Sequence, residues 1–132
     1  MITVEQVRRV FAGLEQGDGA PLFEHVAADV DWTVEGTHPL AGHYQSKKEF
    51  VDATFAKLSR VLAHGAQLCI EHLLIQDQQA VVELRSMAYA KNGMRFDNRY
   101  CWVVYFRDSV IVRVRAYLDS ALVARLFEEN PL

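Results

Sequence analysis

The second half of the chain consists of four strand-like segments joined by very short connections. The segments are 67–76, 79–90, 95–106 and 110–118, and the connections are Asp77-Gln78, Lys91-Asn92-Gly93-Met94 and Arg107-Asp108-Ser109. Connections this short join antiparallel neighbours, because a parallel return needs a crossover of a dozen or more residues. The sequence therefore predicts a meander of antiparallel hairpins, to which the rest of the chain must be fitted.

Residues before position 67 carry two sets of helix signals. Thr3 and Gln6 form a capping-box pattern, which continues with apolar residues at helical spacing: Val4, Val7, Phe11 and Leu14. Ser46 and Glu49 form a second pattern of this kind, and one apolar helix face follows it: Val51, Phe55, Leu58 and Leu62. Each stretch is therefore predicted to be one amphipathic helix.

Shorter elements are expected between and after these helices. A short helix is predicted over 21–25, a strand over 30–34, and a loop over 36–42, which contains two glycines and a proline. A last short helix is expected after Asp119 or Ser120. Helices followed by hairpins are typical of an α+β domain, with helices packed on the inner face of a curved, mixed but mainly antiparallel sheet.

Composition limits the classes of protein that fit this plan. The 132 residues are 51% hydrophobic and 23% charged, which indicates one globular domain over 1–132. The net charge of −3 argues against a nucleic-acid partner. The longest fully apolar run, 101–106, is far shorter than the ~20 residues of a membrane helix, so no membrane partner is expected. The start of the chain lacks the apolar stretch of a signal peptide, and a cytoplasmic location is predicted.

The cysteines and histidines give no sign of a metal centre. Cys69 and Cys101 each lie inside a strand-like segment and are predicted to be buried, reduced thiols. His38 and His43 share a loop, without a third ligand that would fix their geometry. We therefore expect neither a metal nor a cofactor.

Alternation along the strands predicts a pocket on the inner face of the sheet. In segment 95–106 one face is formed by Phe96, Asn98, Tyr100, Trp102, Val104 and Phe106. The opposite face begins with three charged residues and must meet water. In segment 110–118 the inward set is predicted to be Val110, Val112, Val114, Ala116 and Leu118. Small inward residues, namely Ser86, Ala88 and Ala116, leave a cavity unless Trp32, Phe50 and Phe55 fill it.

Three stretches of the sequence resemble a known family. They are Trp32 with Gly36-Thr-His-Pro-Leu-Ala-Gly42, then Asn98-Arg-Tyr-Cys, and finally the segment 115–127, which contains Tyr117-Leu-Asp119. The chain resembles the nuclear transport factor 2-like fold in its SnoaL-like, ketosteroid-isomerase-related branch. This resemblance implies a cone whose pocket is roofed by helices, and a homodimer formed through the outer sheet face. Members of the branch act as isomerases, polyketide cyclases, dehydratases or epoxide hydrolases, or bind without catalysis.

The chain departs from the steroid isomerases at their chemical groups. Those enzymes use an aspartate base and an oxyanion hole of tyrosine and protonated aspartate. The resemblance places these positions at Thr33, Val10 and Trp102, none of which keeps the required side chain. Ala116 also stands where relatives often carry a glutamate. Standard steroid isomerisation is therefore not expected, and the case for epoxide-hydrolase or cyclase chemistry is weakened.

Six residues are the candidates for a functional site. By elimination among the inner faces, His38 is the candidate acid/base group, and Asp119 is either its helper or the N-cap of the last helix. Asn98 and Tyr100 are expected to offer hydrogen bonds to the cavity, and Asn98→Leu to be tolerated by the fold. Trp32 and Trp102 are predicted to form apolar wall, with one N–H donor available from Trp102.

The expected function is the binding of a small, largely apolar molecule, with cofactor-free acid/base chemistry of isomerase, cyclase or dehydratase type. The alternatives are a non-catalytic binder or carrier, and a dimerisation module whose pocket is incidental. If His38 lies beside a second polar group in the pocket, the enzyme is favoured. A pocket lined by tryptophans and aliphatic residues would favour the binder, and a filled core would favour the dimerisation module. The expected homodimer contact is an outer-face patch of Met87, Tyr89, Cys101, Val103 and Tyr105.

Overall fold

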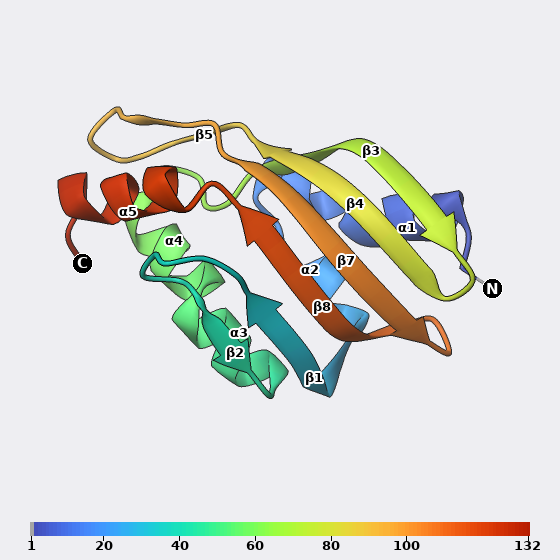
Figure 1. Cartoon of the computed structure of the whole chain (residues 1–132). Coiled ribbons are helices and arrows are strands. Elements are labelled where there is room, and N and C mark those ends of the chain that lie inside the picture. Colours follow the sequence, from blue (N-terminus) through green and yellow to red (C-terminus); the bar gives the residue numbers. More distant parts are fainter. Residues whose placement is uncertain (1) are drawn as a thin grey trace.

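The computed structural model describes residues 2–132 and contains a six-stranded sheet with helices packed against one face (Figure 1). The strand order is β2-β1-β8-β7-β4-β3, and all neighbours are antiparallel except β1 and β8. The strands are β1 Val26–Val34, β2 Gly42–Tyr44, β3 Leu68–Gln76, β4 Gln79–Ser86, β7 Arg99–Arg107 and β8 Val110–Leu118. The predicted α+β class, with its mixed, mainly antiparallel sheet, is confirmed.

The sequence predicted one continuous hairpin from segments 79–90 and 95–106, but this hairpin is interrupted in the structure. Its distal part forms a separate two-stranded ribbon, β5 Ala88–Tyr89 with β6 Arg95–Phe96. At the break, the Ser86 hydroxyl donates to the carbonyl of Phe96 at 2.7 Å, and the Met87 amide donates to Gln67 O at 2.9 Å. These bonds to partners outside the ladder bend the hairpin away from the main sheet.

Three of the helices, α1, α3 and α5, begin at side-chain caps that the sequence predicted. They are α1 Val4–Phe11, the 3-10 helix η1 Ala12–Gln16, α2 Ala20–Glu24, α3 Lys47–Ala53, α4 Phe55–Val61 and α5 Ser120–Glu129. In α1 the capping box is complete, because Thr3 Oγ1 accepts from Gln6 N and Gln6 Oε1 accepts from Thr3 N. The helix predicted after Ser46 is broken at Thr54, whose hydroxyl donates to Phe50 O at 2.7 Å and whose φ and ψ are −126° and −81°.

The predicted set of inward-facing side chains is correct for β7, but it is shifted in part of β8. Phe96, Asn98 and Trp102 are buried on the inner side, as predicted. On β8 a bulge lies opposite Tyr105 and Phe106, so that Phe106 pairs with Ile111 and Tyr105 with Arg113. One extra residue reverses the alternation beyond it. Ile111 is therefore buried, whereas Val110 and Val112, predicted to face inward, are only half-buried.

The helices cover one face of the sheet and leave the other bare. The larger core cluster joins the sheet to α1, η1, α2 and α3, and a smaller one lies under α4, α5 and the ribbon.

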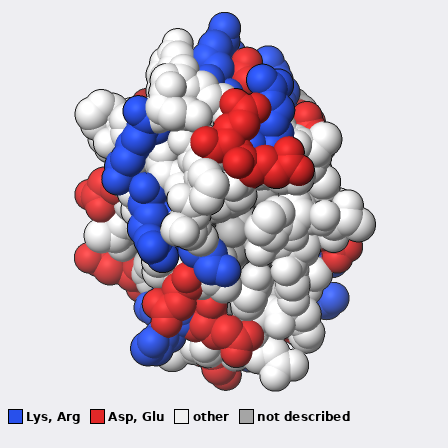
Figure 2. Space-filling view, turned by 90° about the vertical axis from the view of Figure 1, so that its left-hand side faces the viewer, with Lys and Arg blue, Asp and Glu red and all other residues white. Residues whose placement is uncertain are grey.

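Cys69 and Cys101 are free thiols. The sequence predicted that both would be buried, but the structure shows them only half-buried. Figure 2 shows positive and negative side chains in mixed clusters on one side of the molecule. Within residues 2–132, no helix has both the length and the apolar character needed to cross a membrane.

Candidate functional site

A small apolar cavity lies between the inner face of the sheet and helices α3, α4 and α5. Its volume is about 40 Å³. Strands β1, β7 and β8 supply one wall, and helices together with the loop after β1 supply the rest. Its lining residues are Trp32, Val34, Leu40, Phe50, Thr54, Phe55, Leu58, Tyr100, Trp102, Ala116, Leu118 and Val123. Phe55, Tyr100 and Leu118 are the lining residues that are only half-buried.

Aromatic rings fix the shape of this cavity. Trp32 stacks on Phe50 with ring centroids 3.8 Å apart and planes 17° apart. Trp102 meets Trp32 edge-on at 5.3 Å, and Tyr100 meets Trp102 edge-on at 6.5 Å. Stacked and edge-to-face pairs of this kind add to the stability gained from burial alone. The two tryptophans are therefore held in fixed orientations by their neighbours.

The indole N–H groups of Trp32 and Trp102 are buried and have no acceptor among residues 2–132. Trp32 is 0% exposed and Trp102 is 3% exposed. Leaving a buried donor unpaired costs about 1–3 kcal/mol, so two such groups beside one cavity require an explanation. The sequence predicted that both tryptophans form apolar wall and that Trp102 has an available N–H donor. It missed the N–H donor of Trp32. The available signal was a pair of tryptophans facing inward with no acceptor side chain nearby.

Two further polar groups line the cavity. Burial raises the pKa of Tyr100, so its phenol remains protonated over the physiological range. Thr54 is buried, and its hydroxyl is already used in the bond to the Phe50 carbonyl. Tyr100 is the one titratable side chain among the residues that line the cavity. The polar groups of this site are therefore hydrogen-bond donors in an otherwise apolar enclosure.

His38 lies in the loop between β1 and β2 and uses both ring nitrogens locally. Its Nδ1 accepts from Leu40 N at 3.1 Å, which leaves the proton on Nε2 to be donated to Glu35 O at 3.0 Å. Desolvation lowers the pKa of His38, and the bond to the Glu35 carbonyl offsets part of that effect. Leu40 lines the cavity, but His38 is not among the lining residues. The structure thus places the predicted acid/base group beside the site, as a neutral imidazole that holds its own loop.

Asp119 is the N-cap of α5. Its carboxylate Oδ1 accepts from Leu122 N at 3.3 Å, which is the first of the two roles that the sequence left open. Asp119 does not line the cavity. The start of α5 and His38 both pack around Gly36, where an added Cβ would lie 2.1 Å from Ser120 Oγ and 2.8 Å from His38 Cδ2.

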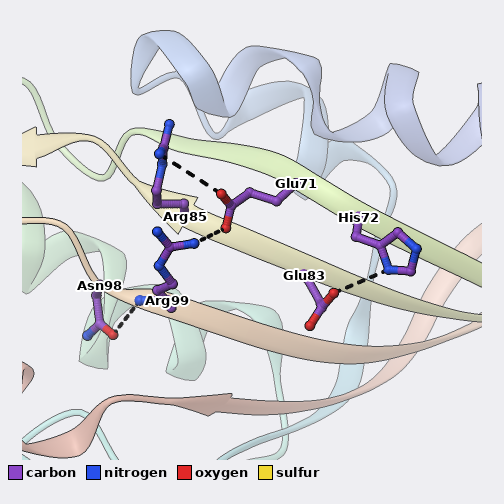
Figure 3. A network of polar contacts seen from close by, with 6 residues as sticks. All are labelled: Glu71, His72, Glu83, Arg85, Asn98 and Arg99. Carbon is purple, nitrogen blue, oxygen red and sulfur yellow. Dashed lines mark hydrogen bonds and ion pairs between the residues drawn. The ribbon is translucent and has the colours of Figure 1, made fainter.

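Asn98 is bonded to main chain, which corrects its expected place in the pocket. Its Oδ1 accepts from Arg99 N at 2.7 Å (Figure 3) and from Asp119 N at 3.1 Å, and its Nδ2 donates to Asp119 O at 3.2 Å. It is 1% exposed and is absent from the cavity lining. Asn98 therefore joins the break before β7 to the junction of β8 and α5. The predicted tolerance of Asn98→Leu does not follow from this geometry.

The structure thus brings three of the six candidates together, namely Trp32, Tyr100 and Trp102. The other three, His38, Asn98 and Asp119, hold the loop and the helix end next to the cavity. His43 pairs with Asp31 at 2.7 Å, and both side chains are half exposed. In the described part of the chain no three His, Cys, Asp or Glu side chains are grouped as metal ligands.

Comparisons with known proteins agree with this architecture. A curated relative, the dimerizing cyclase phiC of a fungal species, is 27% identical over 119 residues, which are 87% of this chain and 53% of the relative. The chain thus spans about half the length of that protein. A nuclear transport factor 2-like protein from Burkholderia thailandensis superposes with a TM-score of 0.79 at 23% identity, covering 93% of this chain and 95% of the other.

A second solved structure shows the same fold. A protein of ketosteroid isomerase-like fold from Catenulispora acidiphila, crystallised with trimethylamine, superposes with a TM-score of 0.72 at 15% identity and covers 92% of this chain and 91% of the other. The sequence of residues 7–114 matches the SnoaL-like domain family. The chain therefore belongs to the SnoaL-like domain family, within the nuclear transport factor 2-like fold.

Proposed function

We propose that this protein binds a small, uncharged, largely apolar molecule in the aromatic cavity and holds an oxygen of that molecule with indole N–H groups. The observation that carries the proposal is the pair of buried N–H donors of Trp32 and Trp102 without acceptors among residues 2–132. A carbonyl oxygen entering the cavity accepts from such a donor and removes the cost of its desolvation. A hydrocarbon of the same shape has no acceptor oxygen, so it leaves the N–H donor unpaired.

The rest of the lining supports an uncharged ligand. None of the residues that line the cavity carries a formal charge near neutral pH. An ion moved into such an enclosure would lose its hydration without gaining a counter-charge, at a cost of several kcal/mol. The volume of about 40 Å³ holds only a small part of a ligand, and the remainder extends past the half-buried Phe55 and Leu118.

The arrangement favours binding over acid/base catalysis. His38 is committed to Glu35 and Leu40, and Asp119 caps α5, so their predicted catalytic roles gain no support from these contacts. Both assignments remain predictions. His38→Gln would test them once a reaction is known, because loss of a general acid or base lowers turnover by roughly 10²–10⁴-fold.

A second candidate function is favoured by the similarity to dimerizing cyclase phiC. In that case the chain promotes cofactor-free ring closure of the bound molecule, with the protonated phenol of Tyr100 donating to the same oxygen. Tyr100→Phe would separate the two functions, since it removes a donor needed for chemistry while leaving both indoles in place.

Self-association through the bare face of the sheet is part of the proposal. Cys101, Val103 and Tyr105 of β7 are half-buried there, and Met87 and Tyr89, which are 40% and 55% exposed, lie where the hairpin leaves the main sheet. Apolar side chains gathered on one uncovered face mark a contact surface more often than free surface. A homodimer formed on this face would cover the three β7 side chains.

The binding proposal can be tested with a pair of ligands of nearly equal shape, cyclohexanone and methylenecyclohexane. The chain has two tryptophans, so its ¹H–¹⁵N spectrum contains two indole N–H signals, both from the cavity. We expect cyclohexanone to bind more tightly and to move at least one indole proton downfield. Trp102→Phe should weaken cyclohexanone about five- to tenfold, the value of one hydrogen bond, and leave the hydrocarbon unchanged.

Tyr105→Phe is the control variant, because Tyr105 does not line the cavity, and it should alter neither affinity. Failure of both ligands to perturb either indole signal at their solubility limits would refute the binding site. Equal affinities, with no downfield shift, would leave an apolar site and refute the role of the indole donors.

A further inference from the structure

A second hollow lies on the opposite side of the sheet from the aromatic cavity, where the central hairpin bends. Its volume is about 280 Å³, near the lower end of the ~300–1,000 Å³ range of ligand pockets. We call it the arginine groove. It is lined by Arg85, Ser86, Met87, Ala88, Tyr89, Arg95, Asp97 and Arg99. The bend between β4 and β5, described above, borders this groove, because Ser86, Met87 and Ala88 line it.

Two of its guanidinium groups are held side by side across the sheet. Arg85 on β4 pairs in register with Arg99 on β7. Glu71 on β3 lies between them, with Oε1 2.5 Å from Arg99 Nη1 and Oε2 4.0 Å from Arg85 Nη1 (Figure 3). One carboxylate thus serves two guanidinium groups. Arg85, Arg99 and Glu71 together carry a net charge of +1. Regular strand pairing holds the three side chains in place.

The third arginine adds no net charge to the groove. Arg95 Nη2 lies 3.4 Å from Asp97 Oδ2, and this pair is largely exposed. The nearby carboxylate of Glu83 is paired with His72 at 3.2 Å and does not line the groove. Among the residues that line the groove, the uncompensated positive charge therefore remains with Arg85 and Arg99.

The Arg85 side chain has an unused donor. Its Nε–H has no hydrogen-bond partner among residues 2–132, and the side chain as a whole is 41% exposed. Guanidinium donors bind carboxylate oxygens in a planar, often two-pronged geometry, and such charge-assisted bonds are stronger than neutral ones. The exposed faces of Met87 and Tyr89 border the same groove and offer contact to an apolar or aromatic body.

We propose that the arginine groove is a binding site for a small monocarboxylate with an aromatic or apolar body, bound by Arg85 and Arg99. A single negative charge matches the single excess positive charge, whereas a dianion such as phosphate would leave a charge uncompensated. This site is separate from the aromatic cavity, which has no charged lining. Its ligand is anionic, whereas the ligand of the cavity is neutral.

The test titrates the intact protein with benzoate and, as a neutral ligand of the same shape, benzamide. We expect benzoate to bind with a dissociation constant on the order of 1 mM, and benzamide at least tenfold more weakly. The Nε–H signal of Arg85 should shift with benzoate. Arg85→Gln should weaken benzoate at least about tenfold, and Arg85→Lys, which keeps the charge but lacks the Nε–H, should weaken it about threefold or more.

Arg113→Gln is the matched control, an outer-face arginine on β8 that does not line the groove. It should leave the affinity for benzoate unchanged. Equal binding of benzoate and benzamide, or equal effects of Arg85→Gln and Arg113→Gln, would overturn the proposal. It would also be overturned if Arg85→Gln altered the sedimentation of the protein without altering benzoate affinity, because the groove would then belong to a contact between copies.

Discussion

Replacement of Asn98 by alanine is the sharpest test of how the candidate site is built. The amide of Asn98 makes three hydrogen bonds to the main chain of Arg99 and Asp119, and the residue is 1% exposed. Asn98→Ala removes all three bonds and leaves their main-chain partners without the amide. At about 1 kcal/mol for each bond, the variant should lose about 3 kcal/mol of unfolding free energy.

The matched control is Asn92→Ala in the ribbon turn. Asn92 also uses both ends of its amide, donating to Glu129 O at 3.2 Å and accepting from Met94 N at 3.0 Å. Both of these bonds are exposed, so water replaces the lost partner. We expect a loss below about 1 kcal/mol for Asn92→Ala.

Urea unfolding followed by circular dichroism, with linear extrapolation to zero denaturant, measures both variants. The m-value should stay constant, because neither change alters the surface exposed on unfolding. If Asn98→Ala cost no more than Asn92→Ala, Asn98 would not join the β7 break to the start of α5, and its sequence-based assignment to the pocket would regain weight.

Three further predictions address the loop, its glycine and the outer face. Burial lowers the folded-state pKa of His38, so the unfolded chain binds its proton more readily, and stability is lost as pH falls below ~6.5 towards that lower value. His38→Gln should flatten this dependence in urea titrations between pH 5 and 8, and an unchanged slope would contradict it. Gly36→Ala should destabilise by more than about 2 kcal/mol, because φ is +121° and the new Cβ meets Ser120 Oγ at 2.1 Å. Gly93→Ala has φ +90° but open space, and should cost only about 1 kcal/mol. Sedimentation at micromolar concentration should show a dimer, and a monomer would refute the outer-face contact.

Several features of the fold follow from the sequence alone, because they depend on interactions within a few residues. Short connections require hairpins, and the capping box of Thr3 and Gln6 starts α1 where predicted. Alternation along β7 placed Trp102 and Phe96 on the inner side correctly. Trp32 and Trp102, which the sequence predicted as apolar wall, are both buried.

Other features depend on partners distant in the sequence. The β8 bulge displaced Val110 and Val112 from the inner face, and it is set by pairing with β7. The bend of the hairpin depends on the bond between Met87 and Gln67, which lie in different strand segments.

The candidate site shows the same division between local pattern and tertiary structure. Sequence placed Trp32, Tyr100 and Trp102 at the cavity because side-chain direction in a strand follows from parity. The sequence could not show that the Asn98 amide is hydrogen-bonded to Asp119, 21 residues away. Nor could it show that both ring nitrogens of His38 are hydrogen-bonded within its own loop. Whether a buried polar group is free depends on every acceptor within about 3.5 Å, and only the packed chain determines which acceptors those are.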